Sequence, residues 1–145
     1  MHIPALPFSR RSEEVRKPLG MRYMENPTTI GEKIRNRRLE LGLLQKDVAD
    51  IFGICVDAVT YWENNRSEPR TIYYPKLIRF LGYVPFEIDT STMAGKMKMY
   101  RFLNGLSQED LAKELGINES TVFHYENGKH LPQPQTLQKM KNIIK

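Results

Sequence analysis

The sequence predicts an all-α protein built from two copies of one small helical unit. Shifted by 63 residues, Gly42–Pro69 aligns without a gap on Gly105–Pro132, and 11 of the 28 aligned positions are identical. Capping residues precede apolar residues with helical spacing, whereas no stretch shows the period-two alternation of a half-buried strand. With 145 residues, 27% of them charged and 40% hydrophobic, the chain suits one ordinary domain or two very small ones.

We divide the chain into four segments. We expect a flexible, basic and proline-rich N-terminal arm over 1–27, a first helical domain over 28–83, a linker over 84–90 and a second helical domain over 91–145. The basic residues of the arm are Arg10, Arg11, Arg16, Lys17 and Arg22. The arm either follows a minor groove or is simply disordered, and both interpretations remain open.

In the first unit, local signals mark where helices begin and end. Thr29 with Glu32 three residues later is a capping-box start, and Gly42 ends the apolar run that follows. A closing helix is expected over 74–81, with Pro75 tolerated in its first turn.

The second unit has stronger caps. We expect Thr90 or Ser91 to cap a helix that ends near Asn104 and Gly105, and Ser107 to cap the next helix, with Asp110 reaching back. A third helix is expected from a cap at Asn118 to Glu126, ended by Asn127 and Gly128, and a closing helix over 136–144.

Each unit places a glycine, Gly53 or Gly116, between two short helices. Two helices joined by about four residues with a central glycine form helix-turn-helix geometry, which lets the second of them enter a major groove. The cap positions differ between the units, because Leu44 and Cys55 stand where the second unit has Ser107 and Asn118. Both caps of the first unit are therefore expected to be weaker.

At these residues both units resemble the phage repressor and Cro type of helix-turn-helix transcriptional regulator, the xenobiotic response element family. The similarity lies in IRNRRLELGLLQKDVADIFGI and VTYWENNRSEP in the first unit, and in MYRFLNGLSQEDLAKELGINESTVFHYENGKHLP in the second. It implies two tandem four- to five-helix bundles of the lambda-repressor-like type, which bind operator DNA, usually as dimers.

The resemblance also implies where DNA contacts lie. A glutamine beginning the second helix touches the backbone or a base, the front of the third helix faces base edges, and an asparagine after it holds phosphate. Arg66 and Lys129, just beyond the third helices, are expected to reach phosphate. The candidate DNA-binding residues are Gln45, Val56, Asp57, Thr60, Tyr61, Asn64 and Arg66 in the first unit, and Gln108, Asn118, Glu119, Ser120, Thr121, Phe123, His124, Asn127 and Lys129 in the second.

The first unit is expected to be the weaker reader of bases. Its third helix offers Asp57 and no arginine or lysine for guanine, which leaves Thr60 and Tyr61 as base contacts. Residues 27–90 carry nine basic and nine acidic side chains, so DNA affinity there requires a local cluster of positive charge. Such a cluster comprises Lys33, Arg35, Arg37 and Arg38.

Arg38 with Glu63 and Arg101 with Glu126 recur at equivalent positions of the repeat, and the resemblance implies that such a pair joins the first helix to the third. We interpret them as structural pairs that fix the third helix, with a direct DNA role for the arginines as the alternative. At another shared position, Trp62 and Tyr125 are expected to anchor the core.

Several classes of protein are excluded by composition. One cysteine and three histidines provide neither a disulfide framework nor a zinc cluster. We expect no catalytic group, cofactor or metal, because neither a phosphate loop nor a Ser/His/Asp set is recognisable. No apolar run is long enough to span a bilayer, so we expect no membrane partner and a cytoplasmic, nucleoid-associated protein. The net charge of +5 permits a polyanionic partner without establishing one.

We therefore expect a regulator of transcription that binds double-stranded DNA, with repression favoured and a homodimer left open. The alternative is an antitoxin-like or adaptor protein in which one unit docks a protein partner. Its sign would be an exposed apolar strip. The candidate strip comprises Ile72, Tyr73, Tyr74, Leu77 and Phe80.

Overall fold

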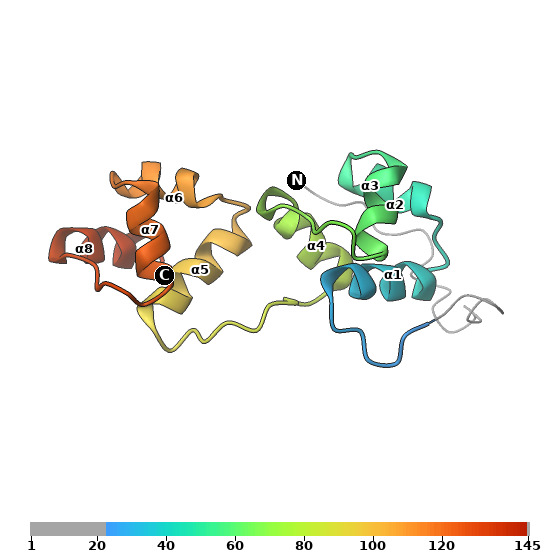
Figure 1. The fold of residues 1–145 in the computed structure, drawn as a ribbon, viewed down its shortest axis with the longest axis horizontal. Helices are drawn as coiled ribbons and strands as arrows, with labels where there is room; N and C mark the ends of the chain where they lie inside the picture. Colours follow the sequence, from blue (N-terminus) through green and yellow to red (C-terminus); the bar gives the residue numbers. More distant parts are fainter. Residues whose placement is uncertain (1–22, 145) are drawn as a thin grey trace. The chain divides into compact units, whose positions relative to one another are not determined.

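The computed structural model describes residues 23–144. Figure 1 shows the helices in chain order, with four α-helices in each half of the described chain. The helices of the first unit are α1 (Ile30–Glu40), α2 (Gln45–Phe52), α3 (Val56–Glu63), the 3₁₀ turn η2 (Thr71–Tyr73) and α4 (Tyr74–Leu81). Those of the second unit are α5 (Met93–Leu103), α6 (Gln108–Leu115), α7 (Glu119–Glu126) and α8 (Pro134–Ile143). No strand occurs between residues 23 and 144, so the all-α prediction is confirmed.

The predicted start of α1 is confirmed. The Thr29 hydroxyl oxygen accepts a hydrogen bond from the Glu32 N–H at 3.1 Å, and the Glu32 carboxylate accepts from the Thr29 N–H at 3.2 Å. At the start of α2, Leu44 has no side chain that can cap, and only the reverse bond forms, from its N–H to the Asp47 carboxylate at 2.8 Å. Cys55 likewise provides no side-chain cap for α3. The cap of α2 is therefore weaker than the Ser107 cap of the second unit, as predicted, whereas Cys55 is no weaker than its counterpart Asn118, which also makes no side-chain capping bond.

The core of the first unit forms around Phe52 and Trp62. The Phe52 ring meets the Trp62 ring at 5.5 Å and the Phe80 ring at 5.8 Å between centroids, in both cases edge to face. Trp62 is only 5% exposed, which confirms it as a core anchor. Because α3 packs against both α1 and α2, this tryptophan fixes the third helix from its inner side.

Gly31 brings α1 unusually close to the end of α3. A Cβ added at Gly31 would lie 1.7 Å from the Trp62 carbonyl oxygen. The approach therefore requires glycine, for lack of space rather than for an unusual backbone angle.

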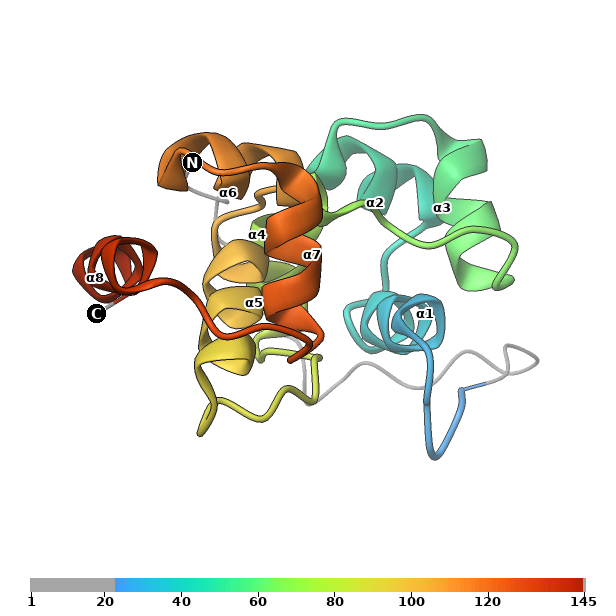
Figure 2. The same cartoon turned by 60° about the vertical axis from the view of Figure 1, so that its left-hand side comes forward.

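The core of the second unit is formed by the inner faces of α5, α6, α7 and α8. Its buried members are Met97, Leu111, Ala112, Leu115, Val122, Tyr125 and Met140. Figure 2 shows α7 running alongside α5, and α7 also packs against α6. Tyr125, 7% exposed, takes the place of Trp62, as predicted.

Three details of the second unit correct the expectations from sequence. The cap of α5 is Thr92, whose hydroxyl accepts from the Gly95 N–H at 3.0 Å. Ser91 is not the cap, because its N–H donates to the Asp89 carboxylate at 2.9 Å. Asn118 occupies the N-cap position of α7 but makes no side-chain capping hydrogen bond. Helix α8 begins two residues earlier than predicted, at Pro134.

The cap of α6 forms as predicted, and it lowers the pKa of Asp110. The Ser107 hydroxyl accepts from the Asp110 N–H at 3.0 Å, while the Asp110 carboxylate accepts from the Ser107 N–H at 3.0 Å. Hydrogen bonds from the Ser107 N–H and then from its hydroxyl hold the pKa of Asp110 below its ordinary value. The folded second unit therefore favours the ionised form of this carboxyl group.

The predicted apolar strip on α4 is wrong. Leu77 is fully buried and Phe80 is 2% exposed, because this face of α4 turns into the core. Tyr73 is half-buried with its ring 5.6 Å from that of Trp62. Ile72, 63% exposed, does not form a strip by itself.

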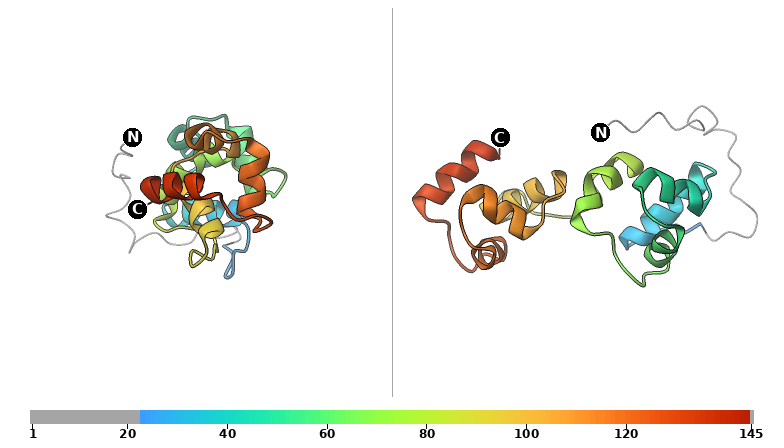
Figure 3. Two further views of the ribbon diagram at one scale, coloured as in Figure 1. Left: turned by 90° about the vertical axis from the view of Figure 1, so that its left-hand side faces the viewer. Right: turned by 90° about the horizontal axis from the view of Figure 1, so that it is seen from above.

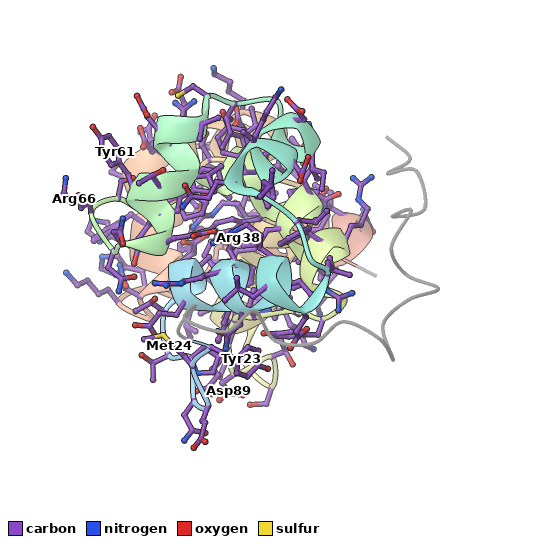
Figure 4. The ribbon with its side chains drawn as sticks, turned by 90° about the vertical axis from the view of Figure 1, so that its right-hand side faces the viewer. Tyr23, Met24, Arg38, Tyr61, Arg66 and Asp89 are labelled. Atoms are coloured by element: carbon purple, nitrogen blue, oxygen red, sulfur yellow. The ribbon has the colours of Figure 1, made fainter. Side chains whose placement is uncertain are left out.

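The first 22 residues of the predicted arm lie outside the described residues, but its last part contacts α1. The buried Asn36 side chain accepts from the Met24 N–H at 3.0 Å and donates to the Met24 carbonyl at 2.6 Å. The Tyr23 hydroxyl donates to Glu40 at 2.8 Å, and this bond is the main cause that raises the pKa of Tyr23. Figure 4 shows Tyr23 and Met24 on the side of α1 away from α3.

A segment without helix connects the two units along the chain. Contacts within the chain divide it between Pro85 and Phe86, and residues 82–92 form turns and extended backbone (Figure 3). The exact domain boundaries stay a prediction. Within residues 23–144, no helix combines the length and the apolar character needed to cross a bilayer.

Candidate nucleic-acid interface

The third helix of each unit is anchored by a buried ion pair. Arg38 donates through Nε to Glu63 Oε1 at 2.6 Å and through Nη2 to Glu63 Oε2 at 2.9 Å. Arg101 makes the same two bonds to Glu126, at 2.7 and 3.1 Å. None of the four side chains is more than 8% exposed. Figure 4 shows Arg38 in the interior between α1 and α3.

Each arginine also fixes the loop before the second helix. Arg38 Nη1 donates to the Leu43 carbonyl at 3.1 Å, and Arg101 Nη1 donates to the Leu106 carbonyl at 3.2 Å. A bidentate guanidinium with a third, backbone partner has little freedom to reorient. The first helix, the following loop and the third helix are thus joined at one point in each unit.

The glutamines that begin α2 and α6 belong to the same networks. Gln45 donates to Glu63 Oε2 at 3.0 Å, and Gln108 donates to Glu126 Oε2 at 2.9 Å. The Thr60 hydroxyl lies 3.0 Å from the Gln45 side-chain oxygen and 3.2 Å from the Val56 carbonyl. A direct base contact by Gln45, Gln108 or Thr60 remains a prediction, and it requires these bonds to be shared or broken.

The outer face of α3 is more apolar than polar. Val56 is 40% exposed and Tyr61 is 46% exposed, while Asp57 and Asn64 are also exposed. Figure 4 shows Tyr61 and Arg66 on the outer side of the unit, near α3 and the loop after it. Leu44, before α2, is 64% exposed. This front therefore combines apolar groups, one carboxylate and a cation beyond the helix end.

The front of α7 has more polar groups. Asn118, Glu119 and Ser120 are exposed, whereas Thr121 is half-buried. Phe123 is 45% exposed, and Lys129 Nζ lies 5.7 Å from the centre of its ring. A lysine held over an aromatic face at a surface retains a charge that can still reach an anion.

Asn127 is exposed and His124 is half-buried, and their contacts with DNA remain predictions. The Asn127 side chain donates to the Phe123 carbonyl at 2.9 Å, and the same carbonyl also accepts the Asn127 N–H at 3.1 Å. The half-buried His124 ring lies 5.3 Å from the His130 ring, edge to face. His124 Nδ1 is buried without a hydrogen-bond partner, so this nitrogen does not face a base edge.

The basic residues of α1 do not form one surface patch, because the fold gives them different partners. Lys33 donates to the Pro85 carbonyl at 3.3 Å, and Arg37 donates to the Phe80 carbonyl at 3.1 Å, while Arg38 is buried in its ion pair. Arg35 lines a hollow of about 380 Å³ together with Gln45 and Asn64. Its Nε is buried without a hydrogen-bond partner, so the place of Arg35 in the lining of this hollow, and not its Nε, supports an anion contact. Arg35 is therefore a candidate anion contact that was absent from the predicted site residues, although the charge cluster in the sequence contained it.

Comparison with known proteins finds one family that matches both halves of the chain. Residues 34–88 and 97–144 match the family described as Helix-turn-helix. The first stretch begins inside α1 and includes α4, and the second begins inside α5 and includes α8. No solved structure matches the chain.

One similar protein is an uncharacterized HTH-type transcriptional regulator of Methanocaldococcus jannaschii. It is 50% identical to this chain over 40 residues, which is 28% of this chain and 61% of the length of that protein. The match therefore spans less than two thirds of this relative.

Proposed function

This chain belongs to the helix-turn-helix family, and on that premise we propose that it is a sequence-specific, double-stranded DNA-binding regulator of transcription. The observation that supports this function best is the repeated anchoring of α3 and α7. In both units a buried arginine–glutamate pair fixes the third helix while the front of that helix stays exposed. A rigid helix with an exposed front is what reading a major groove requires.

The basic groups beside these helices supply affinity for the phosphate backbone. Arg66 and Lys129 are exposed immediately beyond α3 and α7, and Arg35 lines the hollow beside the start of α2. Contacts of this kind fix the register of a protein on the duplex and carry no sequence information.

Specificity comes from the fronts of the two helices, which differ in every residue that we assign to base reading. Val56, Asp57 and Tyr61 in the first unit stand where the second unit has Glu119, Ser120 and His124. A site occupied by both units is therefore asymmetric. Because one chain already carries two base-reading helices, a homodimer is not required to bind a site with two parts. A homodimer would bind a longer, composite DNA site.

We assign the chain a role in which it acts by occupying its DNA site and catalyses no reaction. Binding at a promoter excludes the polymerase sterically, which makes repression the favoured output. A reporter gene placed behind the selected site tests the sign: repression lowers its expression, whereas an activator raises it.

A second candidate function is an antitoxin-like or adaptor role in which the first unit docks a protein. The exposed apolar side chains Leu44, Val56 and Tyr61 favour it, because such groups are common in protein interfaces. The strip on α4 no longer supports this role, since Leu77 and Phe80 are buried.

Selection from random duplex DNA tests the proposed function. We expect one motif to be enriched at roughly 150 mM salt, because specific binding persists where non-specific binding is largely lost. The Arg66→Ala and Lys129→Ala variants should bind that motif more weakly. The absence of any enriched motif would refute DNA reading and favour the protein-docking role.

A further inference from the structure

We propose that both units read mainly pyrimidine groups in the major groove, through a carboxylate for cytosine and an apolar side chain for the thymine methyl group. The specificity-determining residues are Asp57 and Val56 in the first unit, and Glu119 and Phe123 in the second. This inference rests on the proposed function and adds the kind of base that each unit recognises.

Neither third helix contains an arginine or a lysine. The sequences are VDAVTYWE for α3 and ESTVFHYE for α7. The commonest specific contact to guanine is a bidentate arginine or lysine. Arg38 and Arg101 are held in buried ion pairs. Arg66 and Lys129 follow the C-terminal ends of the helices in sequence, and Lys129 Nζ lies 5.7 Å from the centre of the Phe123 ring.

The two glutamines that could read adenine are engaged within the units, whereas the exposed Asn118 at the start of α7 makes no side-chain capping hydrogen bond. Glutamine recognises adenine by donating and accepting at once, but the side-chain nitrogens of Gln45 and Gln108 donate to Glu63 and Glu126. The side-chain oxygen of Gln45 accepts from Thr60 at 3.0 Å. Arginine and lysine are thus absent from both third helices and the glutamines are held within the units, while Asn118 is the exposed amide at the start of α7.

Two exposed carboxylates remain at the helix fronts. Asp57 lies in the first turn of α3 and Glu119 in the first turn of α7. Neither forms an ion pair or a side-chain hydrogen bond within the described residues. Beside phosphates a free carboxylate is repelled unless it accepts a hydrogen bond from the DNA. The N4 amino group of cytosine is the donor that aspartate and glutamate recognise.

An exposed apolar side chain accompanies each carboxylate. Val56 is 40% exposed and precedes Asp57 directly, and Phe123 is 45% exposed. Phe123 follows Glu119 by four residues, so both lie on the same face of α7. The thymine C5-methyl group is the apolar feature of the major groove, and apolar side chains recognise it. Each front therefore pairs one acceptor with one apolar contact.

The carboxylates are tested by amide variants of the full chain. In DNA selections, Glu119→Gln and Asp57→Asn should each change the preferred base at one position from cytosine to adenine, by a factor of roughly 5 to 100. Glu109→Gln removes another first-turn carboxylate, and Asp50→Asn removes another exposed aspartate of the first unit. These two controls should leave the preferred bases unchanged.

The apolar contacts are tested by changing the DNA and not the protein, so a variant that fails to fold cannot affect the result. Replacing thymine by uracil at single positions of the selected site removes one methyl group. At one position in each half, the dissociation constant should rise about fourfold, the value of one buried methyl-sized group. Val56→Ala should abolish this sensitivity in one half and Phe123→Ala in the other.

The failures of the two proposals are distinguishable. If the unaltered chain enriches no motif, the proposed function is wrong and pyrimidine reading falls with it. If a motif is enriched but uracil substitution has no effect and the amide variants keep the cytosine preference, the chain reads DNA by other groups. In that case the first-turn carboxylates serve only the helix dipole, and this inference is overturned.

Discussion

The Arg38–Glu63 pair allows the anchoring of α3 to be tested in the intact chain. Arg38→Met removes the guanidinium and leaves the Glu63 carboxylate, 3% exposed, with Gln45 as its remaining partner. Removing one member of a buried pair costs about 3–5 kcal/mol, because the other charge stays buried. A unit of this size has a free energy of unfolding of roughly 3–9 kcal/mol. We therefore expect the first unit to lose about half of its stability or more.

Urea unfolding followed by tryptophan fluorescence measures this loss. Trp62 is the sole tryptophan of the chain and contacts Phe52 and Tyr73, so its emission reports the first unit alone. Arg101→Met is the matched control, since it removes the equivalent pair from the second unit. That control should leave the Trp62 transition where it is in the unaltered chain.

The double variant Arg38→Met with Glu63→Met separates a buried charge from lost packing. Apolar replacement of a whole buried pair is often neutral or stabilising, so the double variant should recover most of the stability lost by Arg38→Met. The reasoning is refuted if Arg38→Met costs less than about 1 kcal/mol, the range of an exposed pair. It is also refuted if the double variant is no more stable than the single one.

Three further predictions concern packing, DNA affinity and pH. Gly31→Ala should lower the free energy of unfolding by about 1–3 kcal/mol or more in the Trp62 assay, because its Cβ overlaps the Trp62 carbonyl; an unchanged transition would show that α1 and α3 are not in close contact. Lys129→Ala should reduce the slope of log binding constant against log salt by about 1, equally for all DNA sequences, if it contacts one phosphate; an unchanged slope would contradict that contact. Ser107→Ala should destabilise the chain at neutral pH, and its difference from the unaltered chain, followed by circular dichroism in urea, should shrink as pH falls below 3.8. The Ser107 N–H, which the variant keeps, and the Ser107 hydroxyl lower the pKa of Asp110 in the folded state, so the hydroxyl's share of this stabilisation is present above the unfolded value and lost on acidification. The bond from the Asp110 N–H to the hydroxyl does not depend on ionisation; a difference as large at low pH as at neutral pH would contradict the reasoning.

The elements that sequence predicted best are those specified by the repeat. Arg38 and Glu63 are separated by 25 residues, as are Arg101 and Glu126, and this recurrence, together with the resemblance to the repressor family, indicated the pairs from the sequence. The turns at Gly53 and Gly116 follow from positive φ angles of 69° and 68°, which glycine adopts without strain.

The features that the sequence did not predict, the cap of α5 and the buried face of α4, depend on contacts that local sequence patterns do not reveal. Thr90, Ser91 and Thr92 can all cap a helix, and the bond of Ser91 to Asp89 decides among them. The face of α4 that is buried is set by packing on the core, so Leu77 and Phe80 could not be assigned to surface or interior from spacing alone.

The candidate site shows the same limit. Its residue positions followed from the repeat and the resemblance, but the engagement of Gln45 with Glu63 and Thr60 is a tertiary contact between α2 and α3. The pairing of Asn36 with the Met24 backbone is likewise a tertiary contact, which no helical periodicity predicts.

Hydroxyl-radical footprinting on the selected duplex tests the central claim most directly, because it shows which part of the site each unit covers. We predict protection over about two helical turns in two unlike patches. Arg66→Ala should weaken one patch and Lys129→Ala the other. Protection of a single turn would assign reading to one unit, and the absence of any protection at saturating protein would contradict the account.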